Sequence, residues 1–168
     1  MPSKRTVERA RRDKRRGKSA STQAGEFVRE EIDKIRRGKH GARSTKQAIA
    51  IGLSEARRAG VDLPPPKRGQ ATERARKSAR YAYEAGQGRR RPKRRPRRVS
   101  QAVTKALTRE RRSTASRKAL SRQARSAASR RTAAQRSASA RKAARTKGAA
   151  GRSRAAKKAA RTRARRKA

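Results

Sequence analysis

Cysteine and tryptophan are absent from this 168-residue sequence, and its only aromatic residues are Phe27, Tyr81 and Tyr83. Without cysteine, the chain has neither a disulfide framework nor a thiolate metal site. It also lacks any stretch that is long and apolar enough for a transmembrane helix or a signal peptide. We therefore expect the protein to remain on the side of the membrane where it is made.

Large apolar side chains are scarce as well. Hydrophobic residues make up 30% of the sequence, and most of them are alanine, which buries little surface. Low hydrophobicity combined with a high net charge is typical of chains that stay disordered when free. The composition therefore predicts a mostly disordered protein with a small all-α N-terminal helical hairpin.

Acidic residues are few: 11 Asp and Glu stand against 56 Lys and Arg, and the formal net charge is +45. Arginine stays protonated at any ordinary pH, so the chain always attracts counter-anions. In a cell the abundant polyanions are DNA and RNA. The Trp- or Phe-rich amphipathic faces that hold a helix on a lipid surface are missing. We therefore expect nucleic acid, and not a membrane, as the partner.

Residues 21–63 are the only part of the sequence whose pattern makes a case for a folded unit. Phe27 and Ile35 mark the apolar face of the first expected helix. Ser44 opens a second helix with the pattern of a capping box, and Gly60 ends it before a run of three prolines. Two short amphipathic helices joined by a Gly-bounded loop indicate a helical hairpin, which would serve self-association or the docking of a partner.

The other segments are basic and of low complexity. Residues 1–20 are predicted to form a disordered basic arm, and residues 64–98 a Pro- and Arg-rich linker with one further helix at 72–85. Residues 99–168 form an Ala/Arg/Lys-rich basic tail that has no acidic residue after Glu110. Alanine, arginine and lysine favour helix, whereas charge repulsion opposes it. The tail is therefore expected to be disordered when free and helical on nucleic acid.

The linker and the tail supply the predicted DNA contacts. Duplex DNA carries one negative charge per roughly 1.7 Å of its axis, and each neutralised phosphate releases condensed counterions. Small Ala, Ser and Gly spacers bring the backbone close to the groove but offer no surface that reads bases. The predicted contacts are Arg89, Arg90, Arg91, Lys93, Arg94, Arg95, Arg97, Arg98, Arg117, Lys118, Arg130, Arg131, Arg141, Lys142, Arg145, Lys157, Lys158, Arg161, Arg163, Arg165, Arg166 and Lys167.

The segment from Gly88 to Arg98 leaves a narrower alternative open. Arg-rich chains bounded by proline can enter the minor groove of A·T tracts, and this segment looks like an AT-hook. It departs from that pattern because Arg90-Arg91-Pro92 lacks the central glycine. An electrostatic linker without base preference is therefore the preferred interpretation.

No residue pattern indicates an enzyme, a metal site or a cofactor. His40 is the only histidine, and there is no cysteine to complete a ligand set. Glu30 and Glu31 face different directions on a helix, which suits pairing with arginine better than acid–base chemistry. Tyr81 and Tyr83 do not share a helix face, so we expect them to pack on the hairpin more readily than to stack on bases. The sequence predicts a non-enzymatic protein without a small-molecule substrate.

Two resemblances accompany these patterns. Units such as Arg141-Lys142-Ala143-Ala144 make residues 99–168 similar to the bacterial histone H1-like proteins, whose Ala/Lys-rich tails compact the nucleoid. This chain departs from them in favouring arginine over lysine and in its Ser and Thr content. The run Lys46–Ala56, KQAIAIGLSEA, resembles the KQAIAIALSEA motif of small basic bacterial proteins that have no assigned activity. That resemblance spans about residues 26–60.

Together with the charge pattern, the first resemblance implies a sequence-nonspecific, histone H1-like DNA-binding protein. It would compact the nucleoid by neutralising phosphates and bridging duplexes. The expected location is cytoplasmic and nucleoid-associated, or nuclear if the source is eukaryotic. An RNA-binding protein of the ribosomal or ribonucleoprotein type is the alternative, because such proteins carry similar basic extensions. In a further alternative, the hairpin binds a protein and the tail only tethers it.

Overall fold

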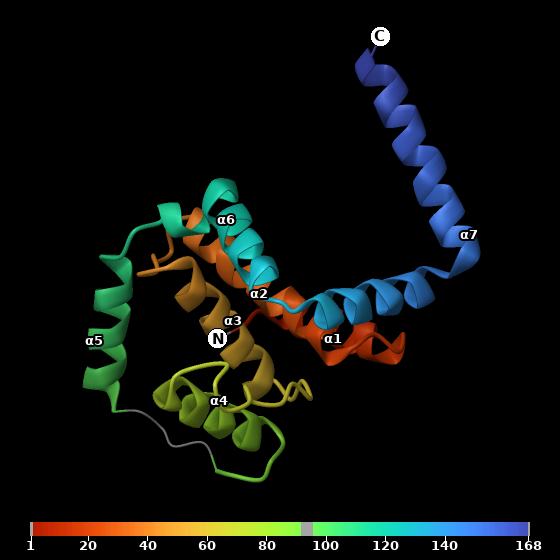
Figure 1. The fold of residues 1–168 in the computed structure, drawn as a ribbon. Coiled ribbons are helices and arrows are strands. Elements are labelled where there is room, and N and C mark those ends of the chain that lie inside the picture. Colours follow the sequence, from red (N-terminus) through yellow and green to blue (C-terminus); the bar gives the residue numbers. More distant parts are fainter. Residues whose placement is uncertain (1, 92–95, 168) are drawn as a thin grey trace. The chain divides into compact units, whose positions relative to one another are not determined.

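The protein is predominantly helical (Figure 1). The computed structural model describes residues 2–91 and 96–167, with side chains up to Arg165. Helix makes up 74% of the structure, so the prediction of a mostly disordered chain is wrong. The chain divides into two compact units, residues 1–123 and residues 124–168. The helices are α1 (Lys4–Arg15), α2 (Ala20–Arg36), α3 (Thr45–Arg58), α4 (Glu73–Gly86), α5 (Arg97–Thr108), the short 3₁₀ helix η1 (Ser113–Ala115), α6 (Arg117–Ser129) and α7 (Ala133–Lys167).

The expected disordered arm at residues 1–20 is instead helix α1, packed against α2. Thr6, Ala10 and Asp13 are buried at helical spacing, which leaves most of the arginines and lysines of α1 exposed. Arg9 Nε lies 2.6 Å from a carboxylate oxygen of Glu26 on α2. The acidic residues of α2 therefore relieve the repulsion that was expected to keep this arm unfolded.

Glu30 of α2 also holds the beginning of α1 in place. Its two carboxylate oxygens accept hydrogen bonds from the backbone N–H of Ser3, at 2.9 and 3.1 Å. Burial by itself would raise the pKa of Glu30. Hydrogen bonds from the Thr6 side chain and the Ser3 amide, together with the charge of Lys34, outweigh burial and lower that pKa.

Helices α2 and α3 occupy the residues of the expected hairpin and carry the centre of the core. Phe27, Ile32 and Ile35 of α2 are buried against the alanines of α3. The helices cross very closely at Gly52, where an added Cβ would lie 2.7 Å from Val28 Cα. The Ser44 hydroxyl accepts the backbone N–H of Gln47 at 3.2 Å, which is the N-terminal cap expected for α3.

A buried arginine closes the turn that follows α3. Arg57 donates from Nε to the Leu63 carbonyl at 3.0 Å and from Nη2 to the Pro64 carbonyl at 3.2 Å. Burial lowers the pKa of this guanidinium. Helix α4 then packs on α3 through Ala79 and Ala82. The Tyr83 hydroxyl on α4 donates to Asp62 at 2.6 Å.

Part of the expected tail returns to the core of the first unit. The backbone N–H of Gly41 donates to the Leu107 carbonyl at 2.8 Å, and the Thr45 hydroxyl donates to the Thr114 carbonyl at 2.7 Å. Ala115 is fully buried among the second set of core residues, and Leu120 packs against the same set. The prediction of disorder from residue 99 onward is therefore wrong. The contacts that order residues 107–120 are made by backbone groups and small side chains, which a count of large apolar residues does not register.

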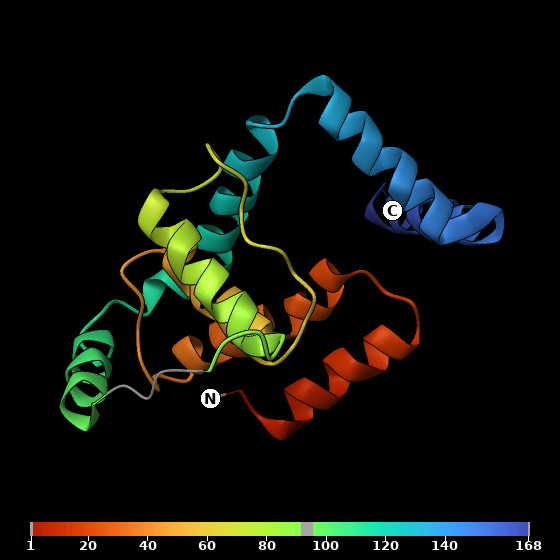
Figure 2. The ribbon, with the colours of Figure 1, turned by 90° about the horizontal axis from the view of Figure 1, so that it is seen from below.

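The second unit consists of the last part of α6 together with the whole of α7. Helix α7 is broken at Gly148, whose φ of 64° and ψ of 175° are not helical. Figures 1 and 2 both show α7 changing direction partway along its length. Residues with a Cβ avoid this combination of dihedral angles. Within residues 2–91 and 96–167, no helix has both the length and the apolar character needed to span a bilayer.

Candidate nucleic-acid interface

The two units differ sharply in charge composition. All 11 acidic residues and 39 of the 56 Lys and Arg lie in residues 1–123, so the first unit carries a net charge of +28. Residues 124–168 contain the other 17 Lys and Arg and no acidic residue. The first unit therefore satisfies part of its positive charge internally, and the second has no acidic side chain with which to do so.

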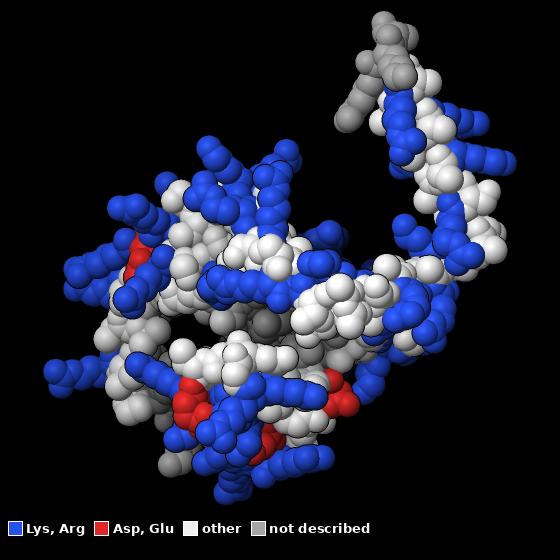
Figure 3. All heavy atoms as spheres, viewed as in Figure 1, with Lys and Arg blue, Asp and Glu red and all other residues white. Residues whose placement is uncertain are grey.

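The cationic side chains of the second unit all face solvent. Every Lys and Arg from residue 124 to residue 165 is exposed. Arg136 and Arg152 donate to the backbone carbonyls of Arg131 and Ala144, and these bonds leave both guanidinium charges unneutralised. Figure 3 shows blue side chains along the visible length of α7 and no red ones. The unit is thus a helical cation without internal counter-charge.

The positive charge surrounds α7 and does not form a single stripe. Arg152 and Arg161 lie on opposite sides of the helix, because nine residues amount to about two and a half turns. Three hydroxyl groups between the cations, those of Ser139, Thr146 and Thr162, donate to the carbonyl four residues earlier. These spacers are turned back onto the backbone, so the groups that reach outward are chiefly guanidinium and ammonium.

The spacing of these charges suits a nucleic-acid duplex. Residues 149–167 form the second straight part of α7 and, at 1.5 Å per residue, extend for about 28 Å. They carry nine Lys and Arg. Over the same length, duplex DNA presents about 17 phosphate charges. A helix of this diameter enters the major groove of B-form DNA, where cations on several sides reach both walls.

The structure places the sequence-predicted contacts in four regions. Arg89, Arg90 and Arg91 follow α4, Arg97 and Arg98 begin α5, Arg117 and Lys118 begin α6, and all the others that it describes lie between Arg130 and Lys167. Lys93, Arg94 and Arg95 lie outside the described residues, and of Arg166 and Lys167 only the backbone is described.

Two of these regions differ from the extended chain expected between Gly88 and Arg98. Arg97 and Arg98 are in the first turn of a helix and are exposed. The Arg90 guanidinium lies over the Tyr81 ring, 4.9 Å from its centroid, and 3.4 Å from a carboxylate oxygen of Glu84. Arg90 therefore already has internal partners, as does Tyr83 through Asp62.

The exposed face of α1 is a cationic surface that the predicted contacts did not include. Lys4, Arg5, Arg12, Lys14 and Arg15 are all exposed there. The sequence signal was available, because Thr6, Ala10 and Asp13 recur at the spacing of a helix face. That signal is weak, because none of those three residues is large and apolar.

A comparison with protein families finds a match over the N-terminal part of the chain. Residues 2–68 match the model of a family described as a family of unknown function (DUF6496). These residues comprise α1, α2 and α3 and include the Lys46–Ala56 run. No curated protein and no solved structure matches the chain. The second unit, with its acid-free helix, lies outside the matched residues.

The carboxylate of Glu31 is buried within the first unit. Glu31 is only 1% exposed, and its Oε1 atom has no hydrogen-bond partner among the described residues. His40 Nε2 lies 3.6 Å away. Burial raises the pKa of Glu31, with His40 and Lys34 opposing the rise and Glu55 and Glu30 adding to it. Among residues 2–91 and 96–167, no cluster of three or more His, Asp or Glu is placed to hold a metal ion.

The buried Glu31 predicts how stability depends on pH. The pKa of Glu31 is higher in the folded state than in the unfolded state. The contribution of Glu31 to the free energy of unfolding is therefore greatest at a pH below its ordinary pKa, and it is lost as the pH rises through the pKa of the folded state. We expect Glu31→Gln to raise the free energy of unfolding at pH 8 by about 1 kcal/mol. Urea denaturation at pH 4 and pH 8 measures this. A variant that is destabilised at pH 8 would contradict it.

Proposed function

We propose that the protein binds duplex DNA without sequence preference and compacts it by neutralising phosphates and bridging duplexes, in the manner of histone H1-like nucleoid proteins. The observation that carries the proposal is the acid-free helical unit at residues 124–168, in which every described Lys and Arg side chain is exposed. No acidic side chain within this unit neutralises its positive charge, so the unit attracts polyanions. Association with the nucleoid would follow from DNA binding, and it depends on the same DNA-binding experiment.

Two observations favour duplex DNA over structured RNA. The straight parts of α7 have the form of a rod, which the wide major groove of B-form DNA admits and the deep, narrow major groove of A-form RNA does not. Residues 99–168 also contain no aromatic residue on which an unpaired RNA base could stack. Binding to ribosomal RNA is the alternative that the experiment must distinguish.

Bridging requires that one molecule contact two duplexes. Gly148 separates α7 into two straight parts that carry cations independently, and the exposed face of α1 provides a further cationic surface on the other unit. These three surfaces share no continuous helix. Each can therefore engage phosphates of a different duplex, which is the physical basis of compaction.

The decisive experiment is a competition between a mixed-sequence DNA duplex and ribosomal RNA, for the full-length protein, from 0.1 to 0.6 M NaCl. With 15–20 phosphates neutralised, the logarithm of the DNA association constant should fall against the logarithm of salt concentration with a slope of about −13 to −18. The duplex should be preferred throughout, with equal affinity for A·T-rich and G·C-rich sequences.

The outcomes separate the candidate functions. Preference for ribosomal RNA at matched salt would replace the DNA proposal with the ribonucleoprotein alternative. Binding that does not respond to salt would contradict phosphate neutralisation itself. Tethering of two labelled duplexes by one protein population, measured by co-sedimentation, tests bridging separately from binding.

A further inference from the structure

Helix α5 has an apolar face that no other described helix covers. Val99 and Val103 are 46% and 40% exposed, and Ala102 and Ala106 are exposed beside them. Leu107, one turn beyond Val103, is half-buried. The spacing of these five residues places them on one side of the helix. Among the described residues no other helix contacts α5, and the hydrogen bond that the Leu107 carbonyl accepts ties only its end to the first unit.

The cations of α5 lie on the other side of the helix. At about 100° per residue, Arg97, Arg98 and Lys105 point roughly 110–150° away from the middle of the apolar face. Arg97 and Arg98 are among the predicted DNA contacts. Contact of that side with phosphates would therefore leave the apolar face directed away from the duplex. No charged side chain lies within the face itself.

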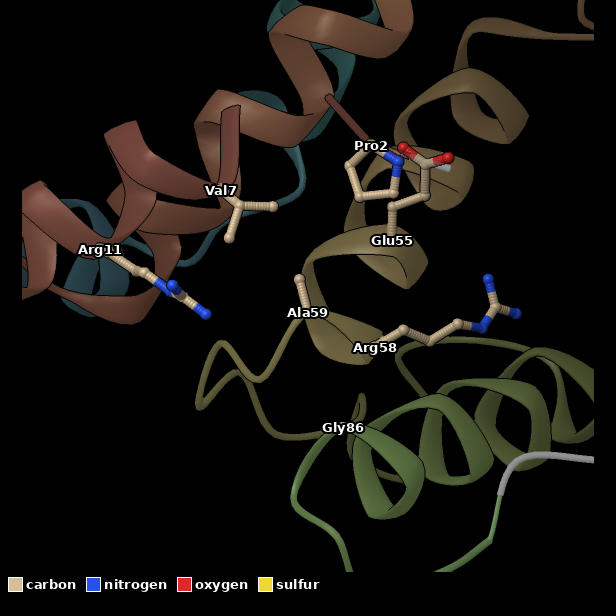
Figure 4. A pocket seen from close by; sticks show the side chains of 7 residues that line it. All are labelled: Pro2, Val7, Arg11, Glu55, Arg58, Ala59 and Gly86. Atoms are coloured by element: carbon tan, nitrogen blue, oxygen red, sulfur yellow. The ribbon is translucent and has the colours of Figure 1, made fainter. Parts of the chain in front are cut away.

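Another aliphatic surface of the first unit is of a different kind. A cavity of about 550 Å³ between α1 and the ends of α3 and α4 presents Val7 and Ala59 (Figure 4). The charged side chains of Arg11, Glu55 and Arg58 line the same cavity, and Figure 4 shows Arg58 directed away from Arg11. That cavity is a hollow with charges of both signs, whereas the apolar face of α5 is convex and uncharged. A helix face of the second kind is usually buried against another apolar helix.

The apolar face of α5 is complementary to itself. Val103 is its central residue, and Val99 and Leu107 lie four residues to either side. Two copies of α5, packed antiparallel about a two-fold axis at Val103, would bring each Val99 against Leu107 of the second copy. Ala102 and Ala106 are small enough to let the two helices approach closely. A second copy of this chain therefore supplies the apolar helix that the face lacks.

Size and charge restrict where such pairing can occur. Helix α5 has 12 residues and is about 18 Å long. Its few apolar side chains supply far less than the roughly 1,200 Å² that a stable protein interface buries. Two free copies, each with a net charge of +45, also repel each other. On DNA the phosphates neutralise that charge, and attachment to one polymer raises the effective concentration of neighbouring copies.

We propose that α5 is a pairing helix through which two DNA-bound copies of this protein associate by their apolar faces, antiparallel and centred on Val103. The inference rests on the proposed DNA binding and adds a partner to it, namely a second copy that is recruited only on the duplex. Helix α7 neutralises phosphates, and α5 joins neighbouring molecules. The consequence is cooperative binding along DNA.

The first test compares two duplex lengths by fluorescence anisotropy of the full-length protein. A duplex of about 20 base pairs carries about as much negative charge as one copy carries positive charge, so it holds one copy, whereas a duplex of about 200 base pairs holds many. On the long duplex, Val99→Gln/Val103→Gln should lose sigmoidal binding and need at least fivefold more protein for half-saturation. Its affinity for the short duplex should change less than twofold. The control, Thr104→Gln/Thr108→Gln, alters exposed residues on the polar side of α5 without changing the charge and should match the unmodified protein on both duplexes.

The second test locates the contact by cross-linking. Because the chain has no cysteine, Val103→Cys introduces a single thiol at the expected two-fold axis, and Gln101→Cys introduces one on the polar side of α5. With the long duplex present, a short bismaleimide should convert Val103→Cys into dimers at least fivefold more efficiently than Gln101→Cys. Without DNA, both variants should stay monomeric.

Several results would overturn the proposal. Equal cross-linking of the two cysteine variants would mean that crowding on DNA accounts for the dimers, and cross-linking without DNA would remove the role of the duplex. Unchanged cooperativity in Val99→Gln/Val103→Gln would show that the face is not used. Loss of that variant's sedimentation with phosphatidylglycerol vesicles, with cooperativity intact, would assign the face to lipid. Failure of the unmodified protein to bind the short duplex would refute the DNA binding itself, which distinguishes that failure from the failure of α5 pairing.

Discussion

A chain that ends at Arg131 is expected to bind duplex DNA roughly 100-fold or more weakly than the full-length protein at 0.1 M salt. The truncation removes α7 and 14 of the 17 Lys and Arg of the second unit, and it leaves α6 and the core contact of Leu120 in place. Fewer released counterions mean a shallower salt dependence, so the log–log slope should become less negative by about 9–12. Fluorescence anisotropy with a labelled duplex over a salt series measures both quantities.

A charge-preserving variant distinguishes the role of the helix from the role of its charge. Ala140→Pro/Ala156→Pro keeps all 17 Lys and Arg and breaks both straight parts of α7. If groove insertion of the rod contributes, this variant should bind severalfold more weakly with nearly the same salt slope. A truncated chain that binds DNA as tightly as the full-length protein would contradict the assignment of the interface to α7.

Replacing Phe27 with alanine should destabilise the first unit by about 3–5 kcal/mol. Phe27 is fully buried among Ala10, Ala24, Ala56 and Val61. No other buried side chain in the described part of the core is as large, and the small residues around it cannot close the cavity. Urea denaturation followed by tyrosine fluorescence measures this unit alone, because Tyr81 and Tyr83 are both on α4 and tryptophan is absent.

The matched control for this variant is Val99→Ala on α5. Val99 is 46% exposed, so its truncation should change the free energy of unfolding by about 0.5 kcal/mol or less. Duplex DNA binding by Phe27→Ala should stay within about threefold of the unmodified protein, because α7 makes no use of this core. A loss of DNA affinity equal to that of the truncated chain would show that the two units act together.

Some of the architecture could be predicted from local patterns. The apolar spacing around Phe27 and Ile35, the cap at Ser44 and the stop at Gly60 indicated the two helices that became α2 and α3. Each of these signals lies within a few residues of the structure that it determines. The same holds for α4, whose expected span of 72–85 is close to the observed Glu73–Gly86.

The order of the whole chain could not be predicted in this way. An argument from composition counts large apolar side chains, and this core is built mainly from alanine with close backbone approaches at Gly41, Gly52 and Gly86. Such contacts gain dispersion and hydrogen-bond energy that a count of large side chains does not register. Packing of α1 likewise depends on Glu26 and Glu30, which are distant from it in sequence.

The sequence by itself determined the charge of this protein and the position of the acid-free segment, on which the proposal of a polyanionic partner rests, because ionisation of arginine does not depend on the fold. Only the tertiary structure decided that residues 107–120 contact the core of the first unit and that α1 packs on α2 through Glu26 and Glu30. Those outcomes rest on contacts between segments far apart in the chain, and such contacts leave no local pattern.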